Sequence, residues 1–597
     1  MLTFKLNIKR QTSNKRFATT EKSPISQSHK SYKNPLAKIK INIMRRILYI
    51  LIIILFYSCK KEDTPPLTEK SFFGDVVLST QQEVDDFVVQ NYVAIYGNLI
   101  IGENENPNTS ITNLSGLSNL TNLSGLSIQY NDALTNLDGL SNLTNLYSLT
   151  IENNDALINI DGLNDISSIS SLRIKNNNTL IDIDGLHHIS STNSLTIENN
   201  NALINIDGLS NLISVDEFLS ILRNNTLSNL DGLSNLTSLN SLTIQYNDAL
   251  KNINGLNDIS SINSLTIENN NALINIDGLN DISSINSLTI ENNNALINID
   301  GLNNLSKIGY VFKIWDNNAL INIDGLSNLI SVDEFLSIQR NNTLSNLDGL
   351  NNLSSIGGNF IIWDNQALSN LDGLNNLKNI GGEFTIWDNQ ALSSLDGLNN
   401  LSSIGRSLDI DSHSLKSIAG LNNLSSIGQN LNIYGKALKS VAGFKNLISI
   451  EGNVDFINTF ELENIEGLRN LTSIGGDLIF FSCFSLKNIN ALINISSVNN
   501  SRFVQCGTLT NLEGLSNLSS INGSLTITSC YSLESLAGLN NLSSITEDLN
   551  IDHNHNLTNL CSLQTLINDN GLGGIYNVFQ NTYNPTYQDI KDGSCSQ

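Results

Sequence analysis

The amino-acid sequence repeats every 23 or 24 residues over most of its 597 positions, and a Gly-Leu pair marks the phase of each repeat. One unit reads LTIENNNALINIDGLNDISSINS. Two degenerate turns, at Ala491 and Ser562, keep the phase and bring the count to about 20 units. So short a unit cannot bury its apolar face alone, and its neighbours must cover it on both sides. The chain is therefore expected to fold as a solenoid with one coil per repeat.

The apolar residues of a coil follow the spacing of strands and turns. Leu265 and Ile267 alternate with polar residues, as in a short strand with one buried face, and further Leu and Ile residues follow at intervals of three. No run has the ten or more residues at 3.6 spacing that a helix needs. The sequence predicts an all-β fold, a right-handed β-solenoid of about 20 coils, capped at both ends. Without a helix on one side, we expect it to curve only gently.

The amino-terminal region has the composition of an export signal. A basic start at residues 44–46 precedes an apolar run of 11 residues, which is too short to span a bilayer. Ending on Cys59, the segment resembles a bacterial lipoprotein signal, and residues 60–63 resemble the acidic export tag of Bacteroidetes-type surface lipoproteins. The resemblance implies lipidation of Cys59 and anchoring in the outer membrane, exposed at the cell surface. The alternative is an uncleaved membrane-associated segment.

These patterns divide the chain into six parts. They are a non-native upstream extension (1–43), a signal peptide (44–58), a tether (59–71), an N-terminal cap (72–101), the repeat solenoid (102–562) and a C-terminal cap (563–597). In the first cap, Thr80 and Glu83 form a capping-box pattern that predicts a short helix. In the second, Asn584-Pro585 predicts a helix start, and Cys561 and Cys595 predict a disulfide suited to an exported protein.

The charge of the exported part is strongly negative. The whole chain carries -24, but residues 1–58 hold 12 Lys and Arg and one acid, which leaves 20 basic and 55 acidic residues, or -35, on the remainder. Such a field argues against nucleic acid and anionic membrane surfaces as partners. It favours cations, basic proteins or neutral glycans.

A column of asparagines recurs eight residues before the phase glycines. Stacked amides there can bond to backbone groups at the bend and to each other, so we expect a structural role. Its members are Asn131, Asn154, Asn177, Asn200, Asn224, Asn247, Asn270, Asn293, Asn317, Asn341, Asn365 and Asn389. On three later coils Cys483, Cys506 and Cys530 take this place. Two of them could pair, but stacked strands hold their β-carbons slightly too far apart, which favours buried thiols.

The repeat resembles two families of solenoids. Its pattern L-x-x-L-x-I-x-x-N-x-x-L-x-x-I-x-G-L is similar to bacterial leucine-rich repeats, and the variant SSIGGNFIIWDNQALSNLDGLNNL resembles the receptor L domain. The likeness covers roughly residues 93–562. It implies a β-solenoid that recognises ligands, largely proteins, through exposed faces and has no catalytic residues. The chain differs from receptor L domains in its far greater length and in lacking their flanking Cys-rich modules.

Aromatic residues gather at the outward position directly after the last Ile of the strand. They are Trp315, Trp363, Trp387 and, further along, Tyr434, with Gln339 between the first two. The indoles of Trp363 and Trp387 lie on consecutive coils and could form a flat platform for a sugar ring or a partner's side chain. The other interpretation is that they stack on each other and stabilise the sheet face.

An aspartate column stands directly before the phase glycines. Neighbouring carboxylates about 4.8 Å apart repel by about 0.9 kcal/mol even in a water-like dielectric. Either each Asp caps its own Gly-Leu turn through a backbone N–H, or divalent cations such as Ca²⁺ bridge adjacent coils. The column comprises Asp138, Asp161, Asp184, Asp207, Asp231, Asp277, Asp300, Asp324, Asp348, Asp372 and Asp396, of which the last six are the candidates for metal binding.

These patterns favour a surface-anchored, non-catalytic recognition or adhesion protein that binds a protein or a glycan along an exposed solenoid face. Solenoid enzymes mount clustered catalytic residues on long loops, and a 23-residue coil leaves no room for such loops. The alternative is a passive stalk or surface-coat element without a specific ligand. No cofactor is predicted apart from the calcium alternative, and contact with the membrane is expected only through the lipid anchor.

Overall fold

The computed structural model describes residues 70–102 and 110–597. Residues 69–597 form one compact unit, and the description below concerns this unit alone. The predicted upstream extension, the signal peptide, Cys59 and all but the last two residues of the predicted tether lie outside the described residues. Within the described ranges, none of the helices has the length and apolar character that crossing a membrane requires.

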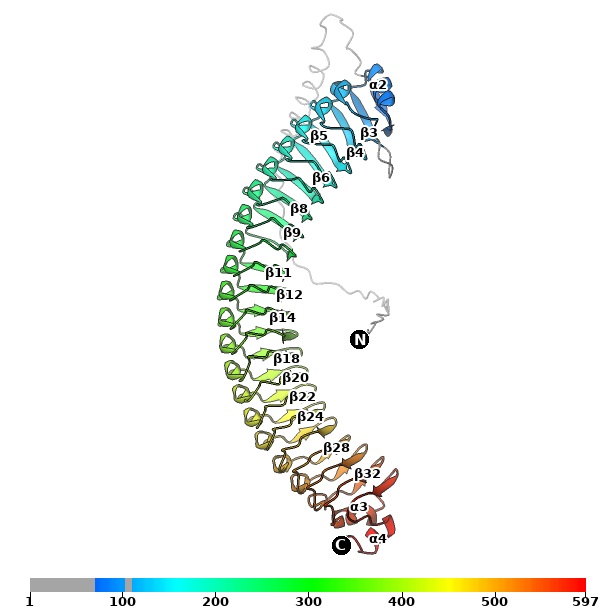
Figure 1. Cartoon of the computed structure of the whole chain (residues 1–597), viewed down its shortest axis with the longest axis vertical. Coiled ribbons are helices and arrows are strands. Elements are labelled where there is room, and N and C mark those ends of the chain that lie inside the picture. The colour runs from blue at the N-terminus through cyan, green and yellow to red at the C-terminus, as the bar shows by residue number, and fades with distance from the viewer. Residues whose placement is uncertain (1–69, 103–109) are drawn as a thin grey trace, which may run out of the picture. The chain divides into compact units, whose positions relative to one another are not determined.

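A small cap covers the first coil (Figure 1). It consists of strand β1 (Ser71–Phe73), strand β2 (Val76–Leu78), helix α2 (Gln81–Val89) and strand β3 (Ala94–Ile101), with β1 and β2 both paired in parallel to β3. The predicted capping box of α2 is confirmed. Thr80 Oγ1 accepts from the Glu83 amide at 3.2 Å, and the Glu83 carboxylate accepts from the Thr80 amide at 3.1 Å. Val84 is buried, so α2 packs one apolar side onto the open end of the stack.

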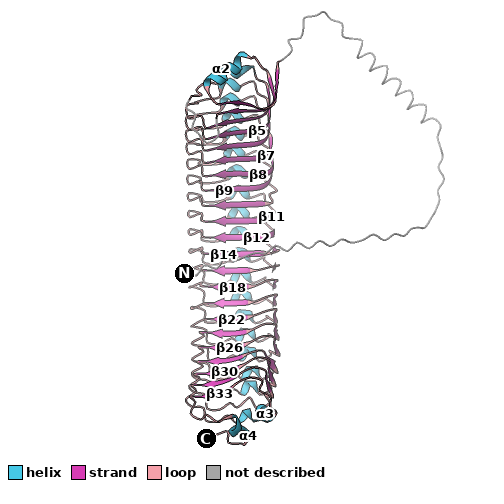
Figure 2. Cartoon of the chain, turned by 90° about the vertical axis from the view of Figure 1, so that its right-hand side faces the viewer, coloured by secondary structure: helices cyan, strands magenta, loops and turns pink. Residues whose placement is uncertain are grey.

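The coils pair their strands in parallel along one face of the unit (Figure 2). The strands of the first coils are continuous: β4 (Asn122–Gln129), β5 (Asn145–Glu152), β6 (Ser168–Lys175), β7 (Ser191–Glu198), β8 (Ser214–Leu222), β9 (Ser238–Gln245), β10 (Ser264–Glu268), β11 (Ser284–Glu291) and β12 (Lys307–Trp315). From residue 331 each coil contributes a short and a longer strand. They are β13 (Ser331–Val332), β14 (Phe335–Gln339), β15 (Ser355–Ile356), β16 (Phe360–Trp363), β17 (Asn379–Ile380), β18 (Phe384–Trp387), β19 (Ser403–Ile404), β20 (Leu408–Asp411), β21 (Ser426–Ile427), β22 (Leu431–Tyr434), β23 (Ser449–Ile450), β24 (Val454–Ile457), β25 (Ser473–Ile474), β26 (Leu478–Phe481), β27 (Ser497–Val498), β28 (Ser501–Val504), β29 (Ser520–Ile521), β30 (Leu525–Thr528), β31 (Ser544–Ile545) and β32 (Leu549–Asp552).

Most of the divided strands coincide with one extra residue in the coil. The inward residues Ile285 and Leu288 are three positions apart, whereas Val332 and Leu336 are four apart. The continuous strands β8 and β12 carry the same extra residue and show it as a register shift against the strand before them.

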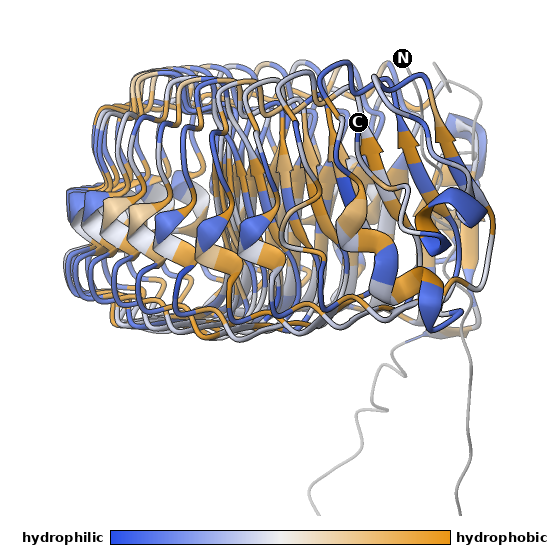
Figure 3. Ribbon diagram, turned by 90° about the horizontal axis from the view of Figure 1, so that it is seen from below, coloured by the Kyte–Doolittle hydropathy of each residue, from blue (hydrophilic) through white to orange (hydrophobic). Residues whose placement is uncertain are grey.

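The core is one continuous column of Leu and Ile, joined by Phe in later coils. In the coil that begins with β10, Leu265, Ile267, Leu273, Ile276 and Leu279 are at most 1% exposed. Figure 3, which looks along the stack, shows that apolar segments occur on every side of the coil. The predicted solenoid and its inward positions are confirmed.

The phase Gly-Leu pairs, with the exception of Gly538-Leu539, lie in single turns of 3-10 helix opposite the strands. A Cβ at Gly301 would collide with the carbonyl oxygen of Ile276 in the preceding coil, so the close approach of the two backbones requires glycine. The turns are η1 (Ser115–Asn119), η2 (Asp138–Leu140), η3 (Asp161–Leu163), η4 (Asp184–Leu186), η5 (Asp207–Leu209), η6 (Asp231–Leu233), η7 (Asn254–Leu256), η8 (Asp277–Leu279), η9 (Asp300–Leu302), η10 (Asp324–Leu326), η11 (Asp348–Leu350), η12 (Asp372–Leu374), η13 (Asp396–Leu398), η14 (Ala419–Leu421), η15 (Ala442–Phe444), η16 (Glu466–Leu468), η17 (Asn490–Leu492), η18 (Glu513–Leu515) and η19 (Cys561–Leu563).

The expectation of a stack that curves only gently, with no helix on one side, was wrong. Within the unit, the strands line the concave side of an arc and the 3-10 turns line its convex side (Figure 1). Backbone hydrogen bonds between neighbouring strands hold the concave side at a spacing of about 4.8 Å per coil. The turns form their backbone hydrogen bonds within their own coil, as Leu279 N–H does to Ile276 O at 3.1 Å, and are linked to the next turn by side chains such as Asn304, which donates to Asn280 O at 2.7 Å. Without a backbone ladder between the turns, the convex side can open.

The asparagine column forms a continuous buried ladder, which confirms its structural role. The Asn270 amide nitrogen donates to Ile244 O at 2.9 Å, to Glu268 O at 3.1 Å and to Asn293 Oδ1 at 3.3 Å. Its Oδ1 accepts from the backbone and side-chain nitrogens of Asn247 at 3.1 and 3.2 Å. Each amide therefore ties its bend to the coils on both sides.

Other residues continue this column beyond Asn389. Thr459 Oγ1 and Cys483 Sγ lie 3.1 Å apart, and Cys530 Sγ donates to Phe503 O at 3.5 Å, as an asparagine amide does in earlier coils. Cys483, Cys506 and Cys530 are buried and free, in agreement with the prediction of buried thiols.

The last coils end in a second cap, made of helix α3 (Gln564–Asn568), strand β33 (Tyr576–Phe579) and helix α4 (Tyr587–Lys591). A disulfide joins Cys561 to Cys595. The predicted start of α4 was wrong, because the N-cap is Thr586, whose side chain accepts from the Asp589 amide at 3.1 Å. Asn584 instead accepts from the Asn581 amide at 2.9 Å and so ends the amide ladder.

Candidate functional site

The four aromatic residues predicted as ligand contacts lie in one row on the concave strand face. Register pairs Trp315 with Gln339, Gln339 with Trp363, Trp363 with Trp387, Trp387 with Asp411, and Asp411 with Tyr434. The row crosses the strands β12, β14, β16, β18, β20 and β22. The structure therefore brings all four aromatic residues together, with two polar residues between them.

Two of the indoles are fixed by polar neighbours. Trp315 Nε1 donates to Ser337 Oγ at 2.9 Å, and Lys313 Nζ lies 4.5 Å from the Trp315 ring centroid. The guanidinium of Arg340 lies 5.3 Å from the ring centroid of Trp363, and it is itself paired with Asp316 at 2.7 Å. These contacts orient the rings without covering them, because both indoles stay partly exposed.

Trp387 is the most open of the three indoles, with 41% of its surface exposed. Among the aromatic contacts of the described residues, none joins Trp363 to Trp387. Stacking of the two indoles on each other is therefore not what holds them, and that interpretation of the pair is not supported. Their register on adjacent strands keeps both rings available on the same face.

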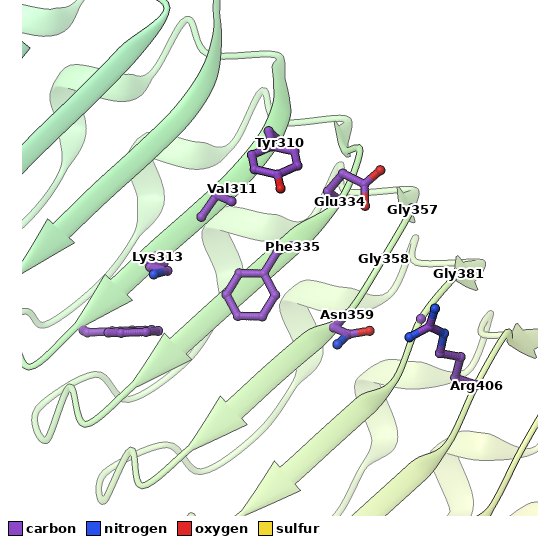
Figure 4. Close-up of a pocket in the computed structure, with 12 residues that line it drawn as sticks. Tyr310, Val311, Lys313, Glu334, Phe335, Gly357, Gly358, Asn359, Gly381 and Arg406 are labelled. Carbon is purple, nitrogen blue, oxygen red and sulfur yellow. The ribbon is translucent and has the colours of Figure 1, made fainter. Parts of the chain in front are cut away.

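A hollow of about 540 Å³ opens on the same face beside Trp315 (Figure 4). Aromatic and charged side chains surround a floor of backbone. Its lining consists of Tyr310, Val311, Lys313, Trp315, Glu334, Phe335, Gly357, Gly358, Asn359, Gly381, Gly382 and Arg406.

Glycines make the floor of the hollow. A Cβ at Gly357 would collide with Asp333 O, and a Cβ at Gly381 would collide with Gly357 O. Side chains are excluded there because successive coils meet backbone to backbone. In the sequence this feature is visible only as the Ile-Gly-Gly variant of the repeat. A single repeat does not indicate that the missing side chains of neighbouring coils together leave one hollow.

The rim of the hollow carries charges of both signs. Arg406 and Glu334 are exposed, and Lys313 lies against Trp315. Tyr310 is 59% exposed. Charged groups at the rim and aromatic surface inside are typical of sites that hold a polar ligand with an apolar part.

Partly buried carboxylates lie on the strand face beside and after the last part of the aromatic row, in β20 and β24. Burial, and then the hydrogen bond with Glu383, raises the pKa of Asp409 to about 7. Burial, and then the charge of Asp477, raises the pKa of Asp455 to about 6. Burial also raises the pKa of Tyr434, with a further contribution from the charges of Asp455 and Asp409. This part of the face thus changes its charge near neutral pH.

The aspartate column does not cap its own turns as proposed from the sequence. The acceptor is the asparagine two residues earlier: Asn298 Oδ1 accepts from the Asp300 amide at 3.2 Å, and Asn322 Oδ1 from the Asp324 amide at 3.1 Å. The predicted repulsion is visible at Asp184, whose pKa is raised first by burial and then by neighbouring carboxylates.

The calcium alternative for this column finds no support in the geometry. In the part of the chain that the structure describes, no three His, Cys, Asp or Glu side chains lie close enough together to hold a metal ion. The six candidates are single carboxylates next to a turn: Asp277, Asp300, Asp324, Asp348, Asp372 and Asp396.

A family model described as the BspA type leucine-rich repeat region matches six copies, over residues 220–334, 313–439 and 432–558. Together these matches span more than half of the chain. The chain belongs to the BspA-type leucine-rich repeat family. The bacterial leucine-rich repeat resemblance is thereby confirmed, and the family is in general non-catalytic. No curated protein sequence matches this BspA-type chain.

Solved structures with leucine-rich repeats are similar to this chain at low identity. A TLR13–ssRNA13 complex is 14% identical over 84% of this chain and 90% of that chain, with a TM-score of 0.23. The ectodomain of the plant receptor kinase GASSHO1/SCHENGEN3 from Arabidopsis thaliana, in complex with CASPARIAN STRIP INTEGRITY FACTOR 2, is 13% identical over 86% and 81%, with a TM-score of 0.19. A leucine-rich repeat protein from Bacteroides ovatus is 14% identical over 60% and 82%, with a TM-score of 0.14. At these TM-scores the likeness carries no argument about a ligand.

Proposed function

We propose that this BspA-type protein is a cell-surface recognition or adhesion protein that binds a segment of a partner protein in the hollow beside Trp315. The observation that carries the proposal is the hollow itself, with its glycine floor, aromatic walls and charged rim. A partner side chain could lie against Tyr310 and Phe335 while Arg406 and Glu334 pair with its charges. Elsewhere the face combines small polar residues such as Ser241 and Thr243 with single exposed aromatic residues such as Tyr147.

A glycan is the second candidate ligand, and the row of indoles favours it. Trp363 and Trp387 are in register on adjacent strands, and Asp411 follows them in the row. Sugars bind by placing a ring on an indole and a hydroxyl on a carboxylate. Binding at this end of the row would spare the hollow, so variants separate the two ligands.

The experiment is an array of extracellular proteins and glycans probed with the full chain, followed by affinity measurements on variants. Tyr310→Ser with Phe335→Ser should weaken binding of a protein ligand at least tenfold, since both rings line the hollow. Tyr147→Ser is the matched control, because Tyr147 is an exposed tyrosine at the corresponding place in β5. Equal losses in the control, or no binder at micromolar concentration, would leave the passive stalk as the better account.

Trp387→Ala tests the glycan alternative in the same assay. It should weaken a glycan ligand and leave a protein ligand bound in the hollow unaffected, because Trp387 does not line the hollow. A loss of melting temperature without a loss of affinity would instead indicate a structural role for the indole.

The proposal includes a lipid anchor at Cys59 on the outer membrane. It rests on the basic start, the short apolar run and the cysteine that follows it. Mass spectrometry of the mature protein tests it: a chain that begins with a lipidated Cys59 is expected, and an unlipidated chain that retains residues 1–43 would contradict it.

A further inference from the structure

A ribbon of exposed isoleucines runs along one flank of the solenoid, between the buried asparagine ladder and the 3-10 turns. Its six isoleucines are 40–52% exposed and occupy the same position of their coils: Ile158, Ile181, Ile204, Ile274, Ile297 and Ile321. Ser228 and Lys251 hold this position in the two coils between the two groups of three. We call the eight residues at this position, from Ile158 to Ile321, the isoleucine ribbon.

Backbone hydrogen bonds join each residue of the ribbon to the next except at the step from Ile204 to Ser228, so the side chains within each group of three are stacked at the spacing of adjacent coils. Ile181 N–H donates to Ile158 O at 3.0 Å, and Ile297 N–H donates to Ile274 O at 3.0 Å. Stacked at about 4.8 Å, three isoleucines form an unbroken apolar strip.

The fold does not require isoleucine at this position. In later coils the same position holds Ser345, Ser369, Lys416 and Glu463. On the other flank, exposed isoleucines such as Ile213 and Ile330 are isolated. Their neighbours in the preceding coil, to which their backbone N–H groups donate, are Ser190 and Ser306. Two exposed apolar strips on one flank therefore call for an explanation other than folding.

Amides outnumber charges in the columns beside the ribbon, where Asp155, Asp182 and Asp248 are the acidic residues, and the aspartate column follows three residues after the isoleucines. On one side of the strips runs an exposed amide ladder, in which Asn201 donates to Asn178 at 2.8 Å and Asn294 to Asn271 at 2.8 Å. On the other side stand the asparagines that cap the turns, such as Asn298.

The order of residues along the ribbon reads the same in both directions: three isoleucines, two polar residues, three isoleucines. A twofold axis between the coils of Ser228 and Lys251 would place Ile181 of one copy opposite Ile297 of the other. Such self-complementarity is the property that an isologous dimer interface needs. We propose that the isoleucine ribbon binds a second copy of this chain, side by side and antiparallel.

The curvature of the unit fits this arrangement. A twofold axis that points from the convex to the concave side reverses the direction of the stack but keeps the concave side in place (Figure 1). Both arcs then bend alike, and their flanks stay in contact along the ribbon. A parallel pair related by an axis along the stack would bend apart and touch only locally.

The contact area is sufficient for a reversible dimer. Eight coils at about 4.8 Å span about 34 Å, and a flank about 15–20 Å wide gives about 500–700 Å² per copy. This is slightly below the area of a standard stable interface, so we expect a dissociation constant in the micromolar range. The dimer would present two concave faces toward the same side, which raises the avidity for a surface that displays several ligands.

Analytical ultracentrifugation of the full chain tests the dimer. Wild type should shift from monomer to dimer over micromolar concentrations, and Ile181→Ser with Ile297→Ser should weaken dimerisation at least tenfold. Serine occurs at this position in other coils, so the variant should keep the fold, which circular dichroism checks. Ile330→Ser, on the opposite flank, is the matched control and should dimerise like wild type. A monomeric wild type at 100 micromolar, or equal effects of both variants, overturns the proposal.

Cross-linking tests the antiparallel direction. A chain with Ile181→Cys mixed with a chain with Ile297→Cys should form a disulfide-linked pair under mild oxidation, whereas neither chain alone should do so. A linked pair from Ile181→Cys alone would show a parallel contact and refute the proposed arrangement.

Discussion

Removing one amide from the buried ladder should destabilise the solenoid far more than removing its exposed neighbour. Asn270→Ala deletes three donated hydrogen bonds and two accepted ones, and it leaves Ile244 O and the Asn247 N–H without this partner in a buried place. At about 1–3 kcal/mol for each buried group left unpaired, the loss of stability is about 3–5 kcal/mol. Asn271→Ala removes two exposed bonds, to Asp248 and from Asn294, and should cost about 0.5 kcal/mol.

A stack of many coils need not unfold in one step, so the assay should resolve individual coils. Hydrogen exchange with peptide-level mass spectrometry reports the opening of the coils around residue 270. Asn270→Ala should speed exchange there about a hundredfold or more, while Asn271→Ala should change it less than about threefold. Asn270→Thr should fall between them, because Thr459 occupies the same column later in the chain.

The reasoning would be refuted if the two alanine variants exchanged at similar rates. That result would mean that stacking of the apolar core alone holds the coils together, and that the buried amides only satisfy one another. A large effect confined to distant coils would equally contradict a nearest-neighbour solenoid.

Three further outcomes are expected. Replacing Cys561 and Cys595 by Ser should lower the stability of the C-terminal cap by about 3–4 kcal/mol, since the disulfide closes a loop with a sequence separation of 34, and the cap should become protease-sensitive first. Burial raises the pKa of Asp409 from 3.8 to about 7, so the folded state holds a proton that the unfolded state loses. Stability should therefore fall as the pH rises from about 4 to about 7, and Asp409→Asn should flatten this profile and raise the melting temperature at pH 8 but not at pH 3. A chelator should leave the melting temperature unchanged, and a drop would restore the calcium alternative for the aspartate column.

The sequence determined the features that recur in every coil. Because residue i contacts its equivalent 23 or 24 positions later, the spacing of Leu265, Ile267 and their counterparts was enough to predict the solenoid and its core. The same periodicity identified the asparagine ladder, since a polar residue that recurs in a buried place needs stacked partners. Local patterns also predicted the capping box at Thr80 and the thiols at Cys483 and its neighbours.

Only the tertiary structure decided what arises between coils. The curvature depends on the difference between a bonded strand side and an open turn side, and no single repeat contains that difference. The backbone amide of each aspartate is capped by the asparagine two residues earlier and not by the aspartate side chain. Asn298 accepts from the Asp300 amide in this way. The hollow needs Tyr310, Phe335 and Arg406 from different coils, together with backbone that carries no side chains. A repeat pattern specifies what each coil shares, whereas this site is made where consecutive coils differ.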